Sequence, residues 1–251
     1  PKEPYLNKLN RAKKSLGQNF LNSEVIVKKI IEIGEVRPED VILEAGPGRG
    51  VLTELLLKKA MKVVAVEKDG SLVSFLNKKF AFEISLGKLE LIHGDILEFN
   101  PEKYGLKNGK YKIIANIPYY ITGIFLKKFL SMAIQPSKMV LMVQKEVAER
   151  IIAKNKKESI FSLSVKAYGT PKYIQTVKAS YFSPQPKVDS AIILIENISK
   201  SFFDSVLEKD FFDLIKTSFA GKRKILKNNL KNFFKKRNEA GNFNEIIEKI
   251  F

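Results

Sequence analysis

The stretch Val41-Ile42-Leu43-Glu44-Ala45-Gly46-Pro47-Gly48-Arg49-Gly50 decides the fold. Its first three residues predict a short buried strand, and its glycines predict a tight turn into a helix over 51–57. Gly46 permits the turn, and Gly48 permits the close approach of a ligand. In an open α/β sheet, ligands bind beyond the carboxyl ends of the strands, where helix N-termini expose amide groups. We therefore expect a binding site around this loop.

The sequence on both sides of this stretch alternates between strand and helix patterns. We expect further strands at 62–67, 89–93, 111–115, 139–143, 173–177 and 188–195, and further helices at 25–33, 72–82, 121–132 and 147–152. The pattern of 161–168 fits either a strand or a helix. Such alternation predicts an α/β fold, a parallel sheet with helices on both faces. After residue 197 the pattern is purely helical, with helices expected at 202–207, 211–219, 225–234 and 243–250.

The chain is strongly basic, with 44 Lys and Arg against 27 Asp and Glu among 251 residues and a net charge of +17. The basic residues cluster: 216–237 and the arm Lys8 to Lys14 contain no acid. This favours nucleic acid as the partner, the alternative being a lysine-rich solubility surface of a heat-adapted protein.

The composition also excludes several classes of site. The chain has no cysteine and only one histidine, His93, which excludes disulfides and cysteine nucleophiles and argues against metal sites and Ser-His-Asp catalysis. There is no 18-residue apolar run and no signal-peptide core, so we expect a cytoplasmic protein that does not enter a membrane.

Two acidic residues at strand ends predict the ligand of the glycine loop. Glu67 lies 21 residues after Gly46 and can accept hydrogen bonds from both hydroxyls of a ribose, and Asp95 can accept one from an adenine amine. Nicotinamide dinucleotides favour Gly-x-Gly-x-x-Gly, whereas the spacing here is Gly-x-Gly-x-Gly, and no second nucleotide-binding half follows. Ribose, adenine and amino-acid contacts suit S-adenosylmethionine (SAM), which contains no phosphate.

The run Asn116-Ile117-Pro118-Tyr119-Tyr120 at the end of the 111–115 strand predicts a second, neighbouring site. These residues can hold a flat, amine-bearing ring such as adenine without charging it. The exocyclic amine of adenine is a poor nucleophile, because its lone pair is delocalised into the ring. It is activated by acceptors that pull on its hydrogens, here the Asn116 side-chain oxygen and the Pro118 carbonyl. Tyr119 can stack on the base, and Phe182, on a loop stiffened by two prolines, is a candidate for its opposite face. The alternative interpretation is a strand-ending turn, with Phe182 in the core.

The motifs described above are similar to those of a known protein family. The chain resembles the ribosomal RNA small-subunit adenine N6,N6-dimethyltransferases (the KsgA family) over nearly its full length. The matching segments are Leu16-Gly17-Gln18-Asn19-Phe20-Leu21, Glu44 to Gly50, Val66-Glu67-Lys68-Asp69, Gly94-Asp95-Ile96, Asn116 to Tyr120 and Phe182-Ser183-Pro184-Gln185-Pro186-Lys187-Val188-Asp189-Ser190.

The resemblance implies a SAM-dependent methyltransferase (Rossmann-like) fold. Its seven-stranded sheet has the last strand antiparallel, and 161–168 is helical. It implies a methyltransferase domain over 1–197 with a basic arm at 1–15, and a small helical RNA-binding domain over 198–251. The donor-binding residues by this match are Asn19, Leu21, Gly46, Glu67, Asp95 and Asn116, and the acceptor-site residues are Asn116, Pro118, Tyr119 and Phe182.

The resemblance also implies the reaction and the partner. Relatives dimethylate two adjacent adenosines near the 3′ end of small-subunit (16S) rRNA in a partly assembled subunit, leaving S-adenosylhomocysteine, and we expect a monomer. Lys222, Arg223, Lys224 and Lys227 are the expected RNA contacts, unless this run is a solvated helix face. The alternatives are a large-subunit rRNA methyltransferase that confers antibiotic resistance, a SAM-binding assembly or transcription factor without turnover, and a nicotinamide oxidoreductase. Tyr120 stands where many relatives have a small polar residue.

Overall fold

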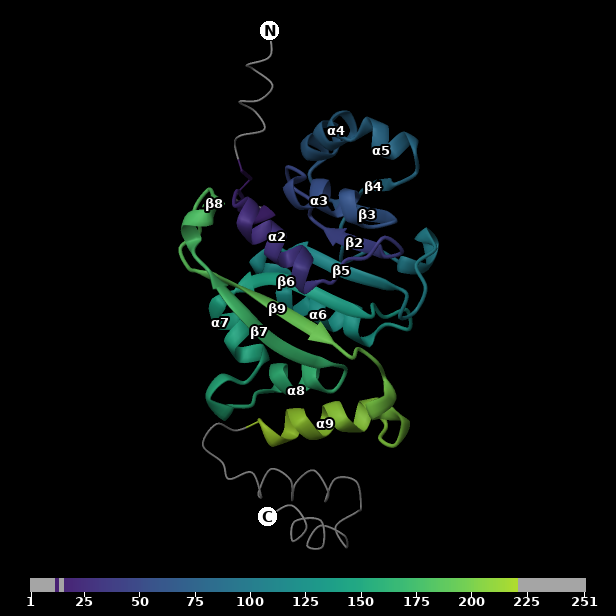
Figure 1. Cartoon of the computed structure of the whole chain (residues 1–251). Helices are drawn as coiled ribbons and strands as arrows, with labels where there is room; N and C mark the ends of the chain where they lie inside the picture. Colours follow the sequence, from purple (N-terminus) through teal and green to yellow (C-terminus); the bar gives the residue numbers. More distant parts are fainter. Residues whose placement is uncertain (1–11, 14–15, 221–251) are drawn as a thin grey trace, which may run out of the picture.

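The computed structural model of the chain describes residues 12–13 and 16–220. Its central element is a seven-stranded sheet in the order β4-β3-β2-β5-β6-β9-β7 (Figure 1). The strands are β2 (Val41–Ala45), β3 (Lys62–Glu67), β4 (Leu89–His93), β5 (Tyr111–Asn116), β6 (Lys138–Gln144), β7 (Thr170–Val177) and β9 (Ser190–Glu196). The first five are parallel, and β9 runs antiparallel between β6 and β7. The expected fold, with its antiparallel last strand, is confirmed.

Helices cover both faces of the sheet because alternate strand residues point to opposite faces. On one face, Ile42, Val63 and Ile114 pack with α2 (Glu24–Ile33), α3 (Val51–Lys59) and α4 (Gly70–Lys79). On the other, Leu43 and Ile113 pack with α6 (Thr122–Ser131), α7 (Lys145–Ile151) and α8 (Ile160–Lys166). The helix expected at 161–168 is thus confirmed as α8.

A second, two-stranded sheet lies at the edge of the domain. β1 (Phe20–Leu21) pairs antiparallel with β8 (Phe182–Ser183), so that Leu21 lies opposite Phe182. Short 3₁₀ turns occupy other loops: Pro101–Tyr104, Tyr119–Ile121 (η3), Lys154–Lys156, Ala179–Tyr181 and Ser201–Asp204. The pairing of β1 with β8 brings the N-terminal segment beside the proline loop.

The helix expected over 72–82 is interrupted. α4 ends at Lys79, and α5 (Ala81–Ser85) starts after Phe80, whose φ of −115° and ψ of 29° are not helical. The Phe80 side chain is buried, and a Cβ at Gly50 would lie 2.5 Å from its ring. The break therefore lets this ring pack under the glycine loop.

The expectation of a helix at 202–207 is wrong. Only Ser201–Asp204 forms a 3₁₀ turn, and α9 (Glu208–Ser218) begins after it. Four phenylalanines in this region contact one another, and two of them, Phe203 and Phe212, also contact Tyr168, with ring centroids 5.1 and 6.2 Å from its own. These aromatic contacts hold α9 against α8. They favour a bend between the 3₁₀ turn and α9 over one continuous helix. The helices expected at 225–234 and 243–250 lie outside the described residues, and the domain boundary near 197 stays a prediction.

Among the helices that the structure describes, none is both long and apolar enough to cross a membrane.

Candidate active site

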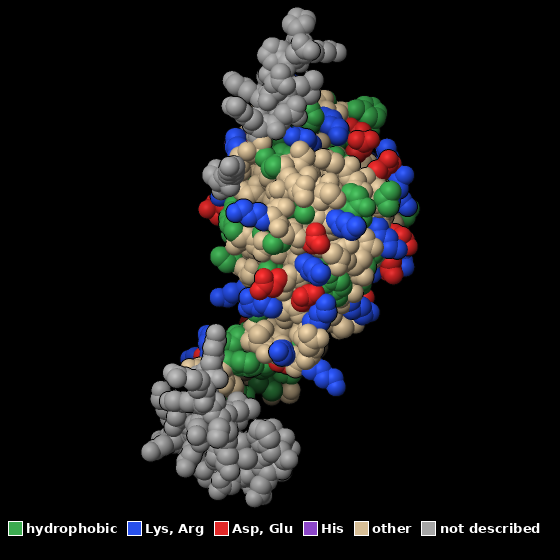
Figure 2. Space-filling model, turned by 90° about the vertical axis from the view of Figure 1, so that its left-hand side faces the viewer, with side chains coloured by type: hydrophobic (Ala, Val, Ile, Leu, Met, Phe, Trp, Pro, Cys, Tyr) green, Lys and Arg blue, Asp and Glu red, His purple; other side chains and the backbone are tan. Residues whose placement is uncertain are grey.

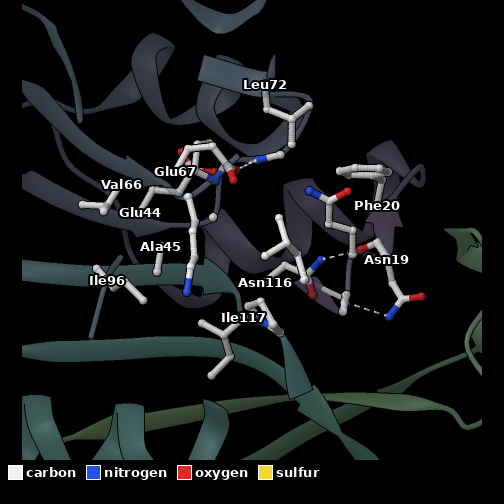
Figure 3. A pocket seen from close by; sticks show the side chains of 18 of the residues that line it. Asn19, Phe20, Glu44, Ala45, Val66, Glu67, Leu72, Ile96, Asn116 and Ile117 are labelled. Atoms are coloured by element: carbon white, nitrogen blue, oxygen red, sulfur yellow. Dashed lines mark hydrogen bonds between the residues drawn. The ribbon is translucent and has the colours of Figure 1, made fainter. Parts of the chain in front are cut away.

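Three polar side chains lie at the carboxyl ends of neighbouring parallel strands, on the same face of the sheet. Glu44 on β2, Glu67 on β3 and Asn116 on β5 each follow the pattern of Ile42, Val63 and Ile114, which face α2, α3 and α4. They border a cavity at the carboxyl ends of these strands (Figure 3). Its lining includes eight of the predicted site residues: Asn19, Leu21, Gly46, Glu67, Asp95, Asn116, Pro118 and Tyr119.

The glycine loop and Glu67 form one wall of the cavity. The Glu67 carboxylate accepts hydrogen bonds from the backbone N–H of Gly48 (3.1 Å) and of Asp69 (2.9 Å), one on each oxygen. Each oxygen keeps a further lone pair for a ligand. Burial raises the pKa of Glu67. Gly46 has a φ of +66°, and a Cβ there would meet no atom within 4 Å, so this glycine faces open cavity.

Asp95 follows β4 and lines the same cavity with both oxygens engaged. Oδ1 accepts from the Leu97 N–H at 2.9 Å, and Oδ2 is paired with the Lys68 ammonium at 2.7 Å. Burial acts to raise the pKa of Asp95, but Lys68 and the Leu97 N–H outweigh it and lower that pKa. Asp95 is therefore a carboxylate at neutral pH, and a ligand amine would share it with Lys68.

The segment before α2 forms the outer wall. The ring of Phe20 lies on Gly48 and under the Arg49 guanidinium, 4.4 Å from the ring centroid. Farther along, Asp69 holds this segment by accepting from Lys13 (2.7 Å) and Gln18 (3.0 Å). Burial acts to raise the pKa of Asp69, but these two side chains and Ser71 keep it well below its usual range. Reasoning from single residues missed this wall, because it depends on contacts between distant segments.

Asn116 joins the two halves of the cavity. Its side-chain Nδ2 donates to the main-chain oxygen of Asn19 at 3.1 Å. A carbonyl only accepts, so the amide is fixed with its oxygen turned away from Asn19. Within the described part of the chain, Asn116 Oδ1 has no hydrogen-bond donor, and it remains available to a ligand.

The acceptor residues after Asn116 lie on the turn into α6. The Pro118 carbonyl accepts from the Ile121 N–H at 3.2 Å, which leaves one lone pair unused. The Tyr119 hydroxyl is 2.7 Å from the Ser190 hydroxyl on β9, and burial raises the pKa of Tyr119. Ser190 is a positioning partner that the sequence did not reveal. Tyr120, 60% exposed, packs its ring against Gly17 at the rim.

Phe182 is the predicted site residue that the structure places elsewhere. It is 4% exposed and packs in the core beside Leu21 and α2 rather than lining the cavity. The pairing of β1 with β8 holds it there, because Phe182 lies opposite Leu21. Its contact with a base therefore stays a prediction. Lys222, Arg223, Lys224 and Lys227 lie outside the described residues.

Comparison with known proteins gives one family. Residues 9–249 match the family model "Ribosomal RNA adenine dimethylase". The chain belongs to this family. Within it, the ribosomal RNA small subunit methyltransferase A of Dehalococcoides mccartyi is 43% identical over 220 residues, 88% of this chain and 75% of that protein. The protein of the same name from Mycoplasmopsis pulmonis is 44% identical over 226 residues, 89% of this chain and 85% of that protein.

Two solved structures are similar to the structure of this adenine dimethylase. A dimethyladenosine transferase from Plasmodium falciparum superposes with a TM-score of 0.74 at 31% identity, covering 84% of this chain and 74% of that one. The 23S rRNA methyltransferase ErmE gives a TM-score of 0.73 at 24% identity, covering 85% of this chain and 84% of its own. The second likeness shows the shared fold alone.

Proposed function

We propose that this chain transfers methyl groups from SAM to N6 of two adjacent adenosines near the 3′ end of small-subunit rRNA, giving N6,N6-dimethyladenosine. The proposal agrees with the family and with the names of its similar relatives. The observation that carries it is the Asn116 amide, held by Asn19 with its oxygen free, in the same cavity as Glu67 and Asp95.

The residues of the cavity fit SAM as the donor. Glu67 has a free lone pair on each carboxylate oxygen for the ribose hydroxyls, and Gly46 leaves the space that a side chain would fill. Asp95 would accept from the adenine amine, while Asn19 and Leu21 close the outer side. Bound here, the donor supplies an electrophilic methyl group on a sulfonium, and the product is S-adenosylhomocysteine.

The acceptor half would prepare an uncharged amine without a general base, and the proton that the methylated nitrogen must lose after transfer would leave to solvent. Asn116 Oδ1 and the remaining lone pair of the Pro118 carbonyl would accept the two N6 hydrogens and favour a pyramidal nitrogen. Tyr119, whose ring is fixed by the bond to Ser190, would stack on the base. No metal-binding group of three or more acidic or His side chains occurs among the described residues.

Replacing Asn116 with alanine separates donor binding from transfer. We expect Asn116→Ala to bind SAM within about tenfold of the wild type and to methylate about 10²-fold more slowly, the usual scale for one lost polar contact to a reacting group. The control is Asn100→Ala, which removes an exposed amide that accepts from the Glu102 N–H and does not line the cavity. Single-turnover transfer of labelled methyl is the measurement, and a normal rate in Asn116→Ala would remove this residue from the mechanism.

The substrate needs its own test because ErmE shares the fold. We infer a partly assembled small subunit as substrate and expect a monomer acting in the cytoplasm, where such subunits assemble. Small and large subunits supplied separately, with methylated adenines mapped by primer extension, test this choice. Methylation of the large subunit alone would favour a resistance methyltransferase, and SAM binding without transfer to either would favour an assembly factor. Displacement of SAM by NAD would favour an oxidoreductase.

A further inference from the structure

Glu44 is buried at the cavity and has no task in the proposed reaction. It is the next-to-last residue of β2, 1% exposed, and it points toward α2 and α3, as Ile42 does two residues earlier. Yet it lines the cavity together with Glu67 (Figure 3), and Gly46 belongs to the same lining. Glu44 is thus an acidic residue at a strand position where the alternation predicts an apolar one.

One oxygen of the Glu44 carboxyl has no hydrogen-bond partner in the protein, although the Thr53 hydroxyl lies near enough to lower the pKa of this carboxyl. Its Oε2 is buried without a hydrogen-bond partner, as are Arg49 Nε and Thr53 Oγ1, and these are the three such side-chain atoms in the described part of the chain. All three come from the strand, loop and helix around the glycines. Native proteins pair nearly all buried polar atoms. Glu44 and Arg49 line the cavity, whereas Thr53 does not, so a bound molecule can supply a partner to the first two.

The surroundings of Glu44 favour its neutral form. Burial raises the pKa of Glu44 to about 8, and the Glu67 carboxylate on β3 acts in the same direction. Thr53 on α3 and the Lys79 ammonium on α4 act to lower it, without cancelling the effect of burial. Arg49, the other ionisable side chain of the loop, has its guanidinium over the Phe20 ring. Without a ligand, burial therefore favours the uncharged form of this carboxyl at pH 7.

We propose that Glu44 senses the charge of the methyl donor: it is neutral in the empty cavity, and it releases its proton to solvent when a ligand of net positive charge is bound. This inference rests on the proposed function. A nearby positive charge favours the ionised form of a carboxyl. SAM carries an ammonium and a sulfonium against one carboxylate, whereas the product has lost the sulfonium charge. After methyl transfer Glu44 regains its proton. The ionised Glu44 therefore raises the affinity of the cavity for SAM relative to S-adenosylhomocysteine.

Titration calorimetry in two buffers of different ionisation enthalpy measures the proton. At pH 7 we expect wild-type protein to release about half a proton or more on binding SAM, and distinctly less on binding S-adenosylhomocysteine. Sinefungin, an analogue with an ammonium in place of the methylsulfonium, should behave as SAM does. In Glu44→Gln the proton release should disappear. SAM affinity should fall about tenfold while affinity for the product changes by less than about threefold.

Two controls keep these outcomes distinct. Glu90→Gln removes a carboxylate that is paired with Lys62 away from the cavity, and it should leave both affinities unchanged. A cooperative thermal unfolding transition is the check that Glu44→Gln is folded. The wild-type carboxyl has a raised pKa when folded, so its stabilising effect is full below about pH 4.5 and is lost as the pH rises toward 8. The melting temperature of the wild type should therefore fall relative to Glu44→Gln over that interval, by roughly 10–20 °C.

The inference is overturned if SAM binds the wild type with heats independent of the buffer. It is also overturned if Glu44→Gln keeps the wild-type preference for SAM over the product. A wild type that binds neither ligand would instead contradict the proposed function.

Discussion

At Asn116 the direction of one side-chain amide is set from outside its own strand. The Asn19 carbonyl, 97 positions earlier in the chain, accepts from Nδ2 and so turns Oδ1 toward the cavity. A free asparagine could present either end of its amide to a base. Asn19 therefore contributes through its backbone, and substituting its side chain need not disturb this contact.

Tyr119 is held in a similar way by Ser190, and this bond can be tested by itself. Tyr119→Phe keeps the ring but loses the 2.7 Å contact between the hydroxyls. One net hydrogen bond is worth about 1 kcal/mol, so we expect methylation to slow about fivefold, and much more in Tyr119→Ala, where the ring is lost as well. The measurement is single-turnover transfer. Tyr173→Phe, which removes an exposed hydroxyl bond to Thr176, is the matched control and should leave the rate unchanged.

The place of a residue in the cavity could be predicted where a strand ends, but not where a contact joins distant segments of the fold. Glu67 and Asn116 follow apolar runs, so their positions could be read from the sequence. Asn19 and Leu21 came only from the family resemblance, because a polar turn before a helix has no pattern of its own. The burial of Phe182 depends on the pairing of β1 with β8, and nothing in its proline loop signals that pairing.

The glycine loop between β2 and α3 combines two requirements. Gly46 and Gly50 both have positive φ, which disfavours any other residue. Gly46 faces open cavity, whereas a Cβ on Gly50 would lie 2.5 Å from the Phe80 ring and 2.8 Å from Leu76. One glycine therefore leaves room for the ligand, and the other leaves room for the core.

Alanine substitutions should separate these two requirements. We expect Gly50→Ala to cost about 2–4 kcal/mol in the free energy of unfolding, from backbone strain plus overpacking. Gly46→Ala should cost about 1 kcal/mol and yet weaken SAM binding at least tenfold, since its methyl group enters the cavity. Gly109→Ala, at a φ of +67° with open space around it, measures the backbone cost alone. Denaturant unfolding measures the free energy of unfolding, and calorimetric titration measures the SAM affinity. Equal SAM affinity in Gly46→Ala and Gly109→Ala would contradict this division.

Element boundaries were predictable where local signals are strong. Ser23 caps α2 by accepting from the Ile26 N–H, and Gly34 ends that helix, both as the sequence indicates. The break at Phe80 and the short turn at Ser201–Asp204 were missed, since each is imposed by packing of aromatic rings rather than by a glycine or proline. Tertiary contacts override local propensity at such points.

Over the whole molecule, the excess of positive charge is the feature that concerns RNA. Figure 2 shows Lys and Arg side chains spread over the side of the molecule that carries β8 and α7, interspersed with acidic ones. The acid-free run of 216–237 lies largely outside the described residues. The local cluster and the general charge are therefore separate candidates for phosphate binding.

A pair of triple substitutions distinguishes the two. Replacing Lys222, Arg223 and Lys224 with glutamine should weaken rRNA binding and reduce the slope of log K against log salt by about three, because each phosphate contact releases about one counterion. The control triple replaces Lys28, Lys29 and Lys58, which pair with acids on α2 and α3, and changes the net charge equally. Filter binding over a salt series measures both. The same slope change in both triples would mean that only total charge matters.

The antiparallel contact of Leu21 with Phe182 has a consequence for the newly made chain. Its partners are separated by most of the polypeptide, so the loop between them must be nearly complete before they meet, and contacts of such separation form slowly. During translation the parallel strands can assemble first, but the outer wall at residues 16–21 stays unanchored on its β8 side until Ser183 has left the ribosomal exit tunnel. A nascent enzyme would thus acquire its ligand affinity only after the chain as far as β8 has been synthesised.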